Sequence, residues 1–94
     1  MRFLPAAERE LDEAFSWYET RSPGLAALFR MEVDRQLARM SEHPLQFPVV
    51  IADIRRARMN RFPYGLFFKI DGEGIFVIAC FHGSRDPRIW QDRV

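Results

Sequence analysis

The stretch Ile54-Arg-Arg-Ala-Arg-Met-Asn-Arg-Phe-Pro-Tyr64 decides the fold, because the apolar pattern changes here from helical to strand-like spacing. Successive side chains of a strand point to opposite faces, so Ala57 and Met59 are predicted to enter a core. The other face then presents Arg56, Arg58 and Asn60. Planar guanidinium groups in a row on a sheet suit phosphate or carboxylate groups. A solvated sheet face is the alternative interpretation, and a register slip of one residue would exchange the two sets of arginines.

The residues after this strand predict a meander of strands. With the first strand at residues 55–62, Pro63-Tyr64-Gly65 predicts a turn and residues 66–70 a second strand. Asp71-Gly-Glu-Gly74 predicts a tight turn before a third strand at Ile75-Phe-Val-Ile-Ala-Cys-Phe81. This third strand is apolar throughout, which is typical of a central strand covered on both faces.

The residues before the stretch predict two helices. Residues 2–4 indicate a short strand, and residues 6–20 carry apolar side chains at helical spacing. Ser22 suits the N-cap of a second helix and Pro23 its first turn. That helix is expected to reach about residue 42. A break this short predicts an antiparallel helical hairpin.

Together these elements predict an α+β fold in the order β-α-α-β-β-β. The helical hairpin would pack on one face of a mainly antiparallel sheet. Residues 45–53 are expected to be an ordered connection, and a short tail helix is expected after Pro87. The other face of the sheet would stay partly open, with Arg56 and Arg58 projecting from it.

The composition indicates one small globular domain over residues 1–94. Residues 1–54 carry six arginines and nine acidic residues, whereas residues 55–94 carry eight basic and four acidic residues. The basic second half is therefore expected to face an anionic partner. A single cysteine excludes an internal disulfide framework, and no apolar run approaches a membrane span. A cytoplasmic location is the expectation that follows.

Several further side chains are candidates for a functional site. His82 ends the last strand next to Gly83, and its imidazole would suit proton transfer near neutral pH; an ordinary loop histidine is the alternative. Arg85 could join Arg56 and Arg58, while Trp90 could anchor the tail or stack on a base. Arg55 and Arg61 fall on the core-facing side of the alternation. The two histidines, one cysteine and scattered acids lack metal-ligand spacing, so no metal or cofactor is expected.

An ordered set of short motifs spans nearly the whole chain. The set comprises Phe3-Leu4-Pro5-Ala6-Ala7-Glu8-Arg9-Glu10-Leu11, Trp17-Tyr18-Glu19, Pro23-Gly24-Leu25, Phe29, Val33, Pro44, Phe47-Pro48, Arg55-Arg56, Phe62-Pro63-Tyr64, His82-Gly83-Ser84-Arg85-Asp86-Pro87 and Trp90. Taken together they resemble the RelE/ParE family, the toxins of bacterial type II toxin–antitoxin modules, also called plasmid stabilisation proteins. The resemblance implies the same fold that the periodicity predicts.

The resemblance also implies two kinds of activity. RelE-like members are metal-independent ribonucleases that cut mRNA on the ribosome, where basic side chains hold the phosphate that a 2′-OH attacks. ParE-like members inhibit DNA gyrase. By position, Arg56, Arg58 and Arg85 match basic residues of the nucleases, with His82 as the proton carrier. Gly65, however, stands where those nucleases tend to carry another arginine.

Three hypotheses follow from the resemblance. Gyrase inhibition is favoured, because the tail offers Trp90, which has no hydroxyl to give or take a proton. The alternatives are an mRNA endoribonuclease and a non-toxic module that only binds an antitoxin. In every case the expected partner is an antitoxin with an acidic, amphipathic C-terminal segment, and any DNA would be reached through the antitoxin. That segment, or the target, is expected to contact Arg55, Arg56, Arg58, Arg61, Arg85 and Trp90.

Overall fold

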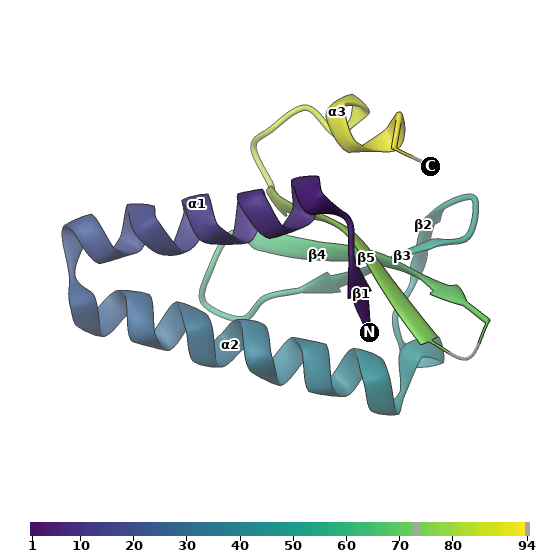
Figure 1. Ribbon diagram of the computed structural model, residues 1–94, viewed down its shortest axis with the longest axis horizontal. Coiled ribbons are helices and arrows are strands. Elements are labelled where there is room, and N and C mark those ends of the chain that lie inside the picture. Colours follow the sequence, from purple (N-terminus) through teal and green to yellow (C-terminus); the bar gives the residue numbers. More distant parts are fainter. Residues whose placement is uncertain (73, 94) are drawn as a thin grey trace.

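The computed structural model describes residues 1–72 and 74–93 and packs a helical hairpin against a five-stranded sheet (Figure 1). The turn expected at residues 71–74 includes Glu73, which lies outside the described residues. The elements are β1 (Arg2–Phe3), α1 (Pro5–Arg21), α2 (Pro23–Glu42), the 3-10 turn η1 (Pro44–Gln46), β2 (Val49–Ile51), β3 (Ile54–Arg58), β4 (Tyr64–Asp71), β5 (Gly74–His82) and α3 (Arg88–Gln91).

Ser22 alone separates the two long helices. Its backbone is extended (φ −165°, ψ 120°), and its N–H donates to the Tyr18 carbonyl at 2.8 Å, which closes α1. Its hydroxyl accepts from the Leu25 N–H at 3.4 Å and caps α2, while Pro23 begins that helix. One extended residue reverses the chain direction, so the predicted antiparallel hairpin is confirmed.

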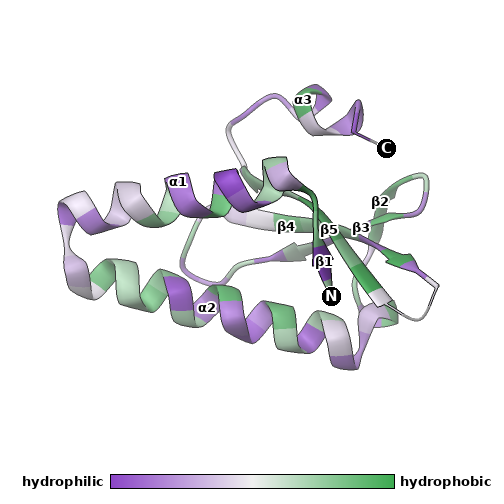
Figure 2. Ribbon diagram, viewed as in Figure 1, coloured by the Kyte–Doolittle hydropathy of each residue, from purple (hydrophilic) through white to green (hydrophobic). Residues whose placement is uncertain are grey.

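The sheet has the strand order β1-β5-β4-β3-β2. β1 runs parallel to β5, and all other neighbours are antiparallel, so the mainly antiparallel sheet is confirmed. β5 lies inside the sheet, and Figure 2 colours it hydrophobic over most of its length. Its side chains enter two separate clusters, as expected for a strand that is covered on both faces.

The larger cluster fills the space between the hairpin and one face of the sheet. It contains Phe29, Val33 and Met40 from α2 together with Leu66 and Phe68 from β4. The smaller cluster lies on the opposite face, under α3. It consists of Ile54, Phe67, Ile78, Ala79, Phe81 and Trp90. The face that was expected to be partly open is therefore covered in part by the tail helix.

The strand predicted at residues 55–62 is shorter than expected, because β3 ends at Arg58. The Met59 N–H donates to the Tyr64 carbonyl at 3.0 Å, so the chain reverses between these residues, and Arg61 lies in the left-handed region (φ 72°). The Glu32 carboxylate of α2 accepts the Asn60 N–H and draws this loop toward the helices. The predicted turn at residues 63–65 is therefore wrong, since Tyr64 already begins β4.

The expected connection at residues 45–53 contains a strand. β2 pairs antiparallel with β3, with Val49 opposite Arg55 and Ile51 opposite Ile54. All three β2 residues are exposed, so the segment lacks the alternation of apolar and polar residues by which a half-buried strand is recognised. This edge strand follows Pro48 and was missed for that reason.

Candidate functional site

A cavity of about 510 Å³ lies on the face opposite the hairpin, between the sheet and the tail. We call it the arginine pocket. Among the described residues that line it, three carry a guanidinium group and none carries a carboxylate. The charged side chains and the imidazole among these residues are Arg56, Arg58, Arg85 and His82. The structure thus brings together the four residues that were predicted for phosphate chemistry.

The strand register explains how the pocket forms. Arg58 of β3 lies opposite Gly65 of β4, and Gly65 lies opposite Phe81 of β5. A glycine in the middle of this row leaves a hollow between its two neighbours. A Cβ atom built at Gly65 would lie 3.4 Å from Arg56 Cγ and 3.6 Å from Phe67 Cε1. Gly65 therefore forms the floor of the arginine pocket. The Arg56 side chain lies partly over this glycine.

Arg85 and His82 form the side of the pocket near the end of β5. The Arg85 guanidinium lies over the Phe81 ring, 4.6 Å from its centroid, which holds the positive charge beside the hollow. His82 Nδ1 accepts the Ser84 N–H at 3.0 Å, so in the neutral ring the proton resides on Nε2. The ring also packs edge-on against Tyr64, with centroids 5.1 Å apart. His82 is thus held in one orientation, with Nε2 as the nitrogen that could donate a proton.

Trp90 closes the pocket from the tail. Its ring stacks on Phe67, with centroids 4.3 Å apart and planes at 27°, and the residue is only 3% exposed. The structure therefore gives Trp90 the anchoring role, one of the two that were expected. In this conformation the Trp90 side chain is covered by the rest of the molecule, so its ring does not face a large partner.

Arg55 and Arg61 do not line the pocket. The Arg55 guanidinium turns to the other face and donates to the Phe47 carbonyl at 2.7 Å, which fastens β3 to the segment before β2. Arg61 lies in the loop that follows β3. The predicted register holds, because Ala57 and Met59 are buried on the hairpin side.

A partly buried ion pair fixes the tail to the first helix. Arg93 donates to both carboxylate oxygens of Glu10, at 2.9 and 2.8 Å, and to the Ile78 carbonyl at 3.1 Å. Glu10 also accepts the Cys80 N–H at 3.1 Å. Glu10 and Arg93 are 83 positions apart in the sequence, so no local sequence pattern indicates this pair.

Burial and the nearby Glu10 carboxylate raise the pKa of the Cys80 thiol to about 12. A thiol with such a pKa stays protonated at neutral pH, and nucleophilic attack needs the thiolate. Cys80 is therefore a small buried apolar residue rather than a nucleophile.

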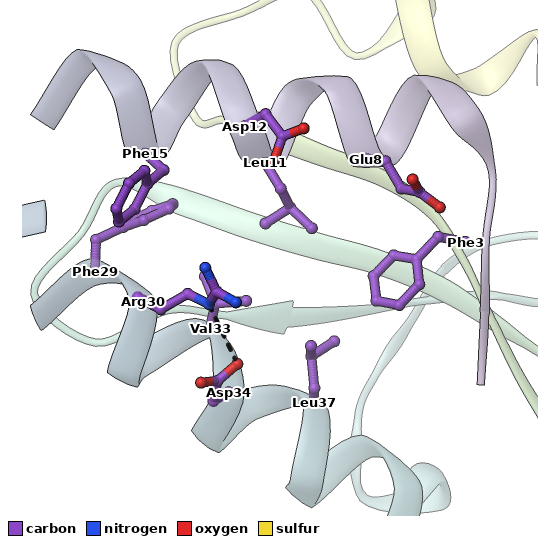
Figure 3. A pocket seen from close by; sticks show the side chains of 10 residues that line it. All are labelled: Phe3, Glu8, Leu11, Asp12, Phe15, Phe29, Arg30, Val33, Asp34 and Leu37. Atoms are coloured by element: carbon purple, nitrogen blue, oxygen red, sulfur yellow. Dashed lines mark ion pairs between the residues drawn. The ribbon is translucent and has the colours of Figure 1, made fainter. Parts of the chain in front are cut away.

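A second cavity, of about 300 Å³, lies between α1 and α2, and we call it the helical groove (Figure 3). Leu11 and Phe15 of α1 and Leu37 of α2 point into it, with Phe3 at one end. Charged side chains surround these apolar residues. They are Glu8, Asp12, Arg30 and Asp34, and Arg30 is paired with Asp34 at 3.9 Å. In contrast to the arginine pocket, this groove is acidic.

Within the described ranges, no group of three or more His, Cys, Asp or Glu residues is placed to hold a metal ion. The helices in this part of the chain are all too short or too polar to cross a membrane.

Known proteins resemble the chain in sequence and in fold. A family model described as "ParE toxin of type II toxin-antitoxin system, parDE" matches residues 1–87. Toxin ParE2 of Mycobacterium tuberculosis, in strains CDC 1551 / Oshkosh and ATCC 25618 / H37Rv, is 27% identical over 88 residues, covering 93% of this chain and 84% of that protein. A solved structure described as "Chromosomal ParDE TA system from P. aeruginosa" has a TM-score of 0.74 and 18% identity, covering 86% of this chain and 91% of that chain.

The family match extends from β1 through β5 and the turn after it, and ends at Pro87. It therefore includes the strands and helices that build the helical groove, and also Arg56, Arg58, Gly65, His82 and Arg85 of the arginine pocket. Trp90 and Arg93 lie beyond the match. On a match of this extent, the chain belongs to the ParE toxin family of type II toxin–antitoxin systems.

Proposed function

We propose that this toxin acts in the cytoplasm by inhibiting DNA gyrase, and that a cognate antitoxin keeps it inactive by binding to it. The family match supports the toxin role, and the resemblance to ParE-like members rather than nucleases supports gyrase as the target. No hydrolytic step is required of the toxin under this proposal, because binding to the gyrase–DNA complex is sufficient to block it.

The incomplete nuclease site is the observation that carries this proposal. Gly65 occupies the floor of the arginine pocket, where the nucleases tend to place a further arginine. The aromatic residue of the tail is Trp90, whose ring is buried and has no hydroxyl to exchange a proton. The pocket keeps the groups that bind an anion but lacks part of the set that would cleave a phosphodiester.

A supercoiling assay tests the proposal. Purified toxin is titrated against gyrase with relaxed plasmid and ATP, and both supercoiling and cleaved gyrase–DNA complex are measured. We expect supercoiling to stop and cleaved complex to accumulate at toxin excess. Relaxation of the supercoiled form of the same plasmid by a type I topoisomerase is the control, and it should be unaffected. Unimpeded supercoiling without cleaved complex would refute the proposal.

An mRNA endoribonuclease is the alternative, because Arg56, Arg58, Arg85 and His82 share one pocket. In that reaction the RNA 2′-hydroxyl oxygen attacks the phosphorus and its proton passes to water, while the bond to the 5′-oxygen breaks. His82, protonated at both ring nitrogens, would give its Nε2 proton to the leaving oxygen, so that a 2′,3′-cyclic phosphate and a 5′-hydroxyl end form. Loss of one arginine that stabilises the developing charge should cost about 2–4 kcal/mol of transition-state stabilisation. If Arg58→Ala and His82→Ala leave mRNA cleavage in cells unchanged, this alternative is excluded.

The third hypothesis is a protein that binds an antitoxin without being toxic. Induced expression in the absence of the antitoxin separates it from the first two. Normal growth at a confirmed protein level would favour this hypothesis, whereas growth arrest would exclude it.

We further propose that the antitoxin uses both cavities, which have opposite charge. The helical groove offers apolar side chains surrounded by three carboxylates and one arginine, and the arginine pocket offers three guanidinium groups on the other side of the sheet. An antitoxin segment that is acidic throughout would be repelled at the groove. We therefore revise the expected partner to a segment with apolar and basic side chains at the groove and acidic side chains at the arginine pocket.

A further inference from the structure

β2 is an edge strand without the residues that usually protect the edge of a sheet. It is the last strand in the strand order, so its outer side has no neighbouring strand in the described part of the chain (Figure 1). Edge strands present backbone N–H and C=O groups to other chains, and charged side chains or prolines within the strand reduce this hazard. The run Val49-Val50-Ile51 contains neither. Its residues are 49%, 38% and 40% exposed, so β2 offers an apolar strand to a partner.

The sequence of β2 suits pairing with a second copy of itself. Two identical strands that pair antiparallel are related by a two-fold axis through one residue. An axis at Val50 places Val49 opposite Ile51 of the second copy, so that β-branched apolar side chains oppose each other along the whole strand. Val50 also has no counterpart on β3, because the register between β2 and β3 shifts at this residue. The register centred on Val50 therefore uses all three residues of β2.

The charges next to β2 complement each other in this register. Asp53 follows Val50 by three residues and Phe47 precedes it by three, so Asp53 of one copy comes beside Phe47 of the other. Two guanidinium groups lie at Phe47. Arg55 donates to its carbonyl at 2.7 Å, and Arg39 lies over its ring, 5.0 Å from the centroid. Neither arginine is in an ion pair within the described residues, and Asp53 is exposed and also free of one.

We propose that β2 is a dimerisation strand, through which two copies of the chain pair antiparallel around Val50, with Asp53 of each copy facing Arg39 and Arg55 of the other. Opposite side chains of an antiparallel pair lie on the same face of the sheet. The two sheets would thus join into one, with both helical grooves on one face and both arginine pockets on the other. No residue of β2 lines either cavity, so both cavities stay open in the dimer.

The dimer goes beyond the proposed function, because it requires neither gyrase nor antitoxin. A monomeric toxin could still stop supercoiling, and a dimeric one could fail to do so, so the two results are independent. A three-residue strand with its flanking charges buries less than the roughly 800 Å² per partner of a typical stable interface. We therefore expect a weak dimer that dissociates on dilution.

Sedimentation velocity of the purified full chain tests the proposal. The protein is examined at concentrations from about 1 to about 200 μM, a range that covers weak association. We expect the sedimentation coefficient to rise from the monomer value to the dimer value across this range. A chain that is still entirely monomeric at about 200 μM would overturn the proposal.

Paired variants test whether β2 is the interface. Val50→Lys brings two ammonium groups together at the two-fold axis and should leave the protein monomeric at every concentration. Met31→Lys is the matched control, since Met31 is an apolar residue of α2 that is 66% exposed, and it should dimerise like the wild type. Circular dichroism checks that both variants are folded. A dimer that survives Val50→Lys, or that both variants lose equally, would overturn the interface.

The charge contacts are tested by a reversal at the turn. Asp53→Arg replaces the attraction to Arg39 and Arg55 of the other copy by repulsion, twice in each dimer. Because exposed ion pairs contribute little individually, we expect the dissociation constant to rise about tenfold. An unchanged dissociation constant would overturn the register centred on Val50.

A disulfide cross-link tests the same register directly and does not depend on the lysine variant. Residues directly opposite in an antiparallel pair have Cα atoms about 4.5–5.5 Å apart, which is within the range that a disulfide spans. Val50→Cys should therefore form a covalent dimer under mild oxidation, whereas Met31→Cys should do so at least about ten times more slowly. The native Cys80 is buried and does not interfere. Equal rates for the two variants would overturn the proposal. Protection of β2 from amide exchange only when the antitoxin is added would assign the strand to the antitoxin instead.

Discussion

Gly65 shows how one residue sets the character of a site. Because this position has no side chain, the Arg56 stem and the Phe67 ring approach the backbone closely, with Arg56 Cγ 3.4 Å and Phe67 Cε1 3.6 Å from where a Cβ atom would lie. Gly65 thus belongs to the wall of the arginine pocket without contributing a side chain to it.

Arg93→Ala should destabilise the protein by about 3 kcal/mol, because it leaves the Glu10 carboxylate largely buried without its partner. The two side chains are only 16% and 10% exposed, and they share two hydrogen bonds. Urea unfolding followed by circular dichroism measures the change. The matched control is Arg9→Ala, which removes an exposed arginine of the same helix as Glu10. A loss below about 1 kcal/mol would show that the pair behaves as an exposed surface pair.

Glu32 should make the stability depend on pH in the acid range. Burial alone would raise the pKa of Glu32, but hydrogen bonds from Arg35, the Asn60 N–H and Gln36 outweigh it and hold this pKa below its usual range. A lowered folded-state pKa stabilises the protein above the unfolded value of about 4.3, and this stabilisation is lost as the pH falls through the folded value.

The free energy of unfolding of Glu32→Gln should therefore fall less steeply below about pH 4 than that of the wild type. Glu19→Gln, at an exposed position of α1, is the control. Identical acid-side slopes for the wild type and Glu32→Gln would show that this carboxylate does not hold the loop after β3.

At the scale of elements, α3 depends on its contacts with the rest of the molecule. It comprises only Arg88–Gln91, too short for a stable helix in isolation. Asp86 accepts the Arg88 N–H at 3.0 Å and so satisfies a donor at the start of the helix. The Trp90 ring on Phe67 fixes α3 to the sheet, and the Arg93–Glu10 pair just beyond its C-terminus fixes the tail to α1.

Trp90→Ala should cost about 3–5 kcal/mol of stability and release α3 from the sheet. The indole is almost fully buried and fills the smaller of the two clusters. Amide hydrogen exchange measures the release, and we expect loss of protection in α3 and at its contacts on β4. Trp90→Phe keeps an aromatic ring and should restore most of the stability. Unchanged protection in the alanine variant would contradict the anchoring role.

The elements that could be predicted from the sequence are those with local signals. Ser22 and Pro23 mark the helix boundary through capping chemistry, and the apolar run before His82 identifies β5 as an inner strand. β2 escaped prediction because its residues are exposed and do not alternate. The early end of β3 depends on the Glu32–Asn60 contact, which joins residues distant in the sequence.

The site could also be predicted only in part, because several of its contacts join residues that are distant in the sequence. The alternation of β3 places Arg56 and Arg58 correctly, and Arg85 and His82 join them as expected. The hydrogen bond of Arg55 to Phe47 and the burial of Trp90 follow from tertiary packing. The acidic helical groove was not predicted as a site, since it requires the faces of two helices to be placed relative to each other.

At the scale of the whole molecule, charge is separated between the two sides of the sheet. The acidic helical groove lies on the hairpin side, and the arginine pocket lies on the other side under α3. This separation corresponds to the acidic first half and the basic second half of the sequence. A partner that covers both cavities must present opposite charges to them.

Binding of the cognate antitoxin should therefore weaken with salt. Raising sodium chloride from about 50 to about 500 mM shortens the range of electrostatic attraction severalfold and should reduce the affinity at least about tenfold. Isothermal titration calorimetry at both salt concentrations measures this change. Replacing Arg58 and Arg85 with glutamine should remove part of the salt dependence. An affinity indifferent to salt would show that the arginines are not part of the docking surface.

The most direct measurement of the central claim follows DNA and mRNA in one culture after the toxin is induced without its antitoxin. Gyrase-linked DNA breaks are recovered from lysed cells, and mRNA ends are mapped from the same sample. A gyrase-directed ParE toxin with an incomplete nuclease site predicts that gyrase-linked breaks rise while mRNA stays intact. Cleaved mRNA without gyrase-linked breaks would contradict the account.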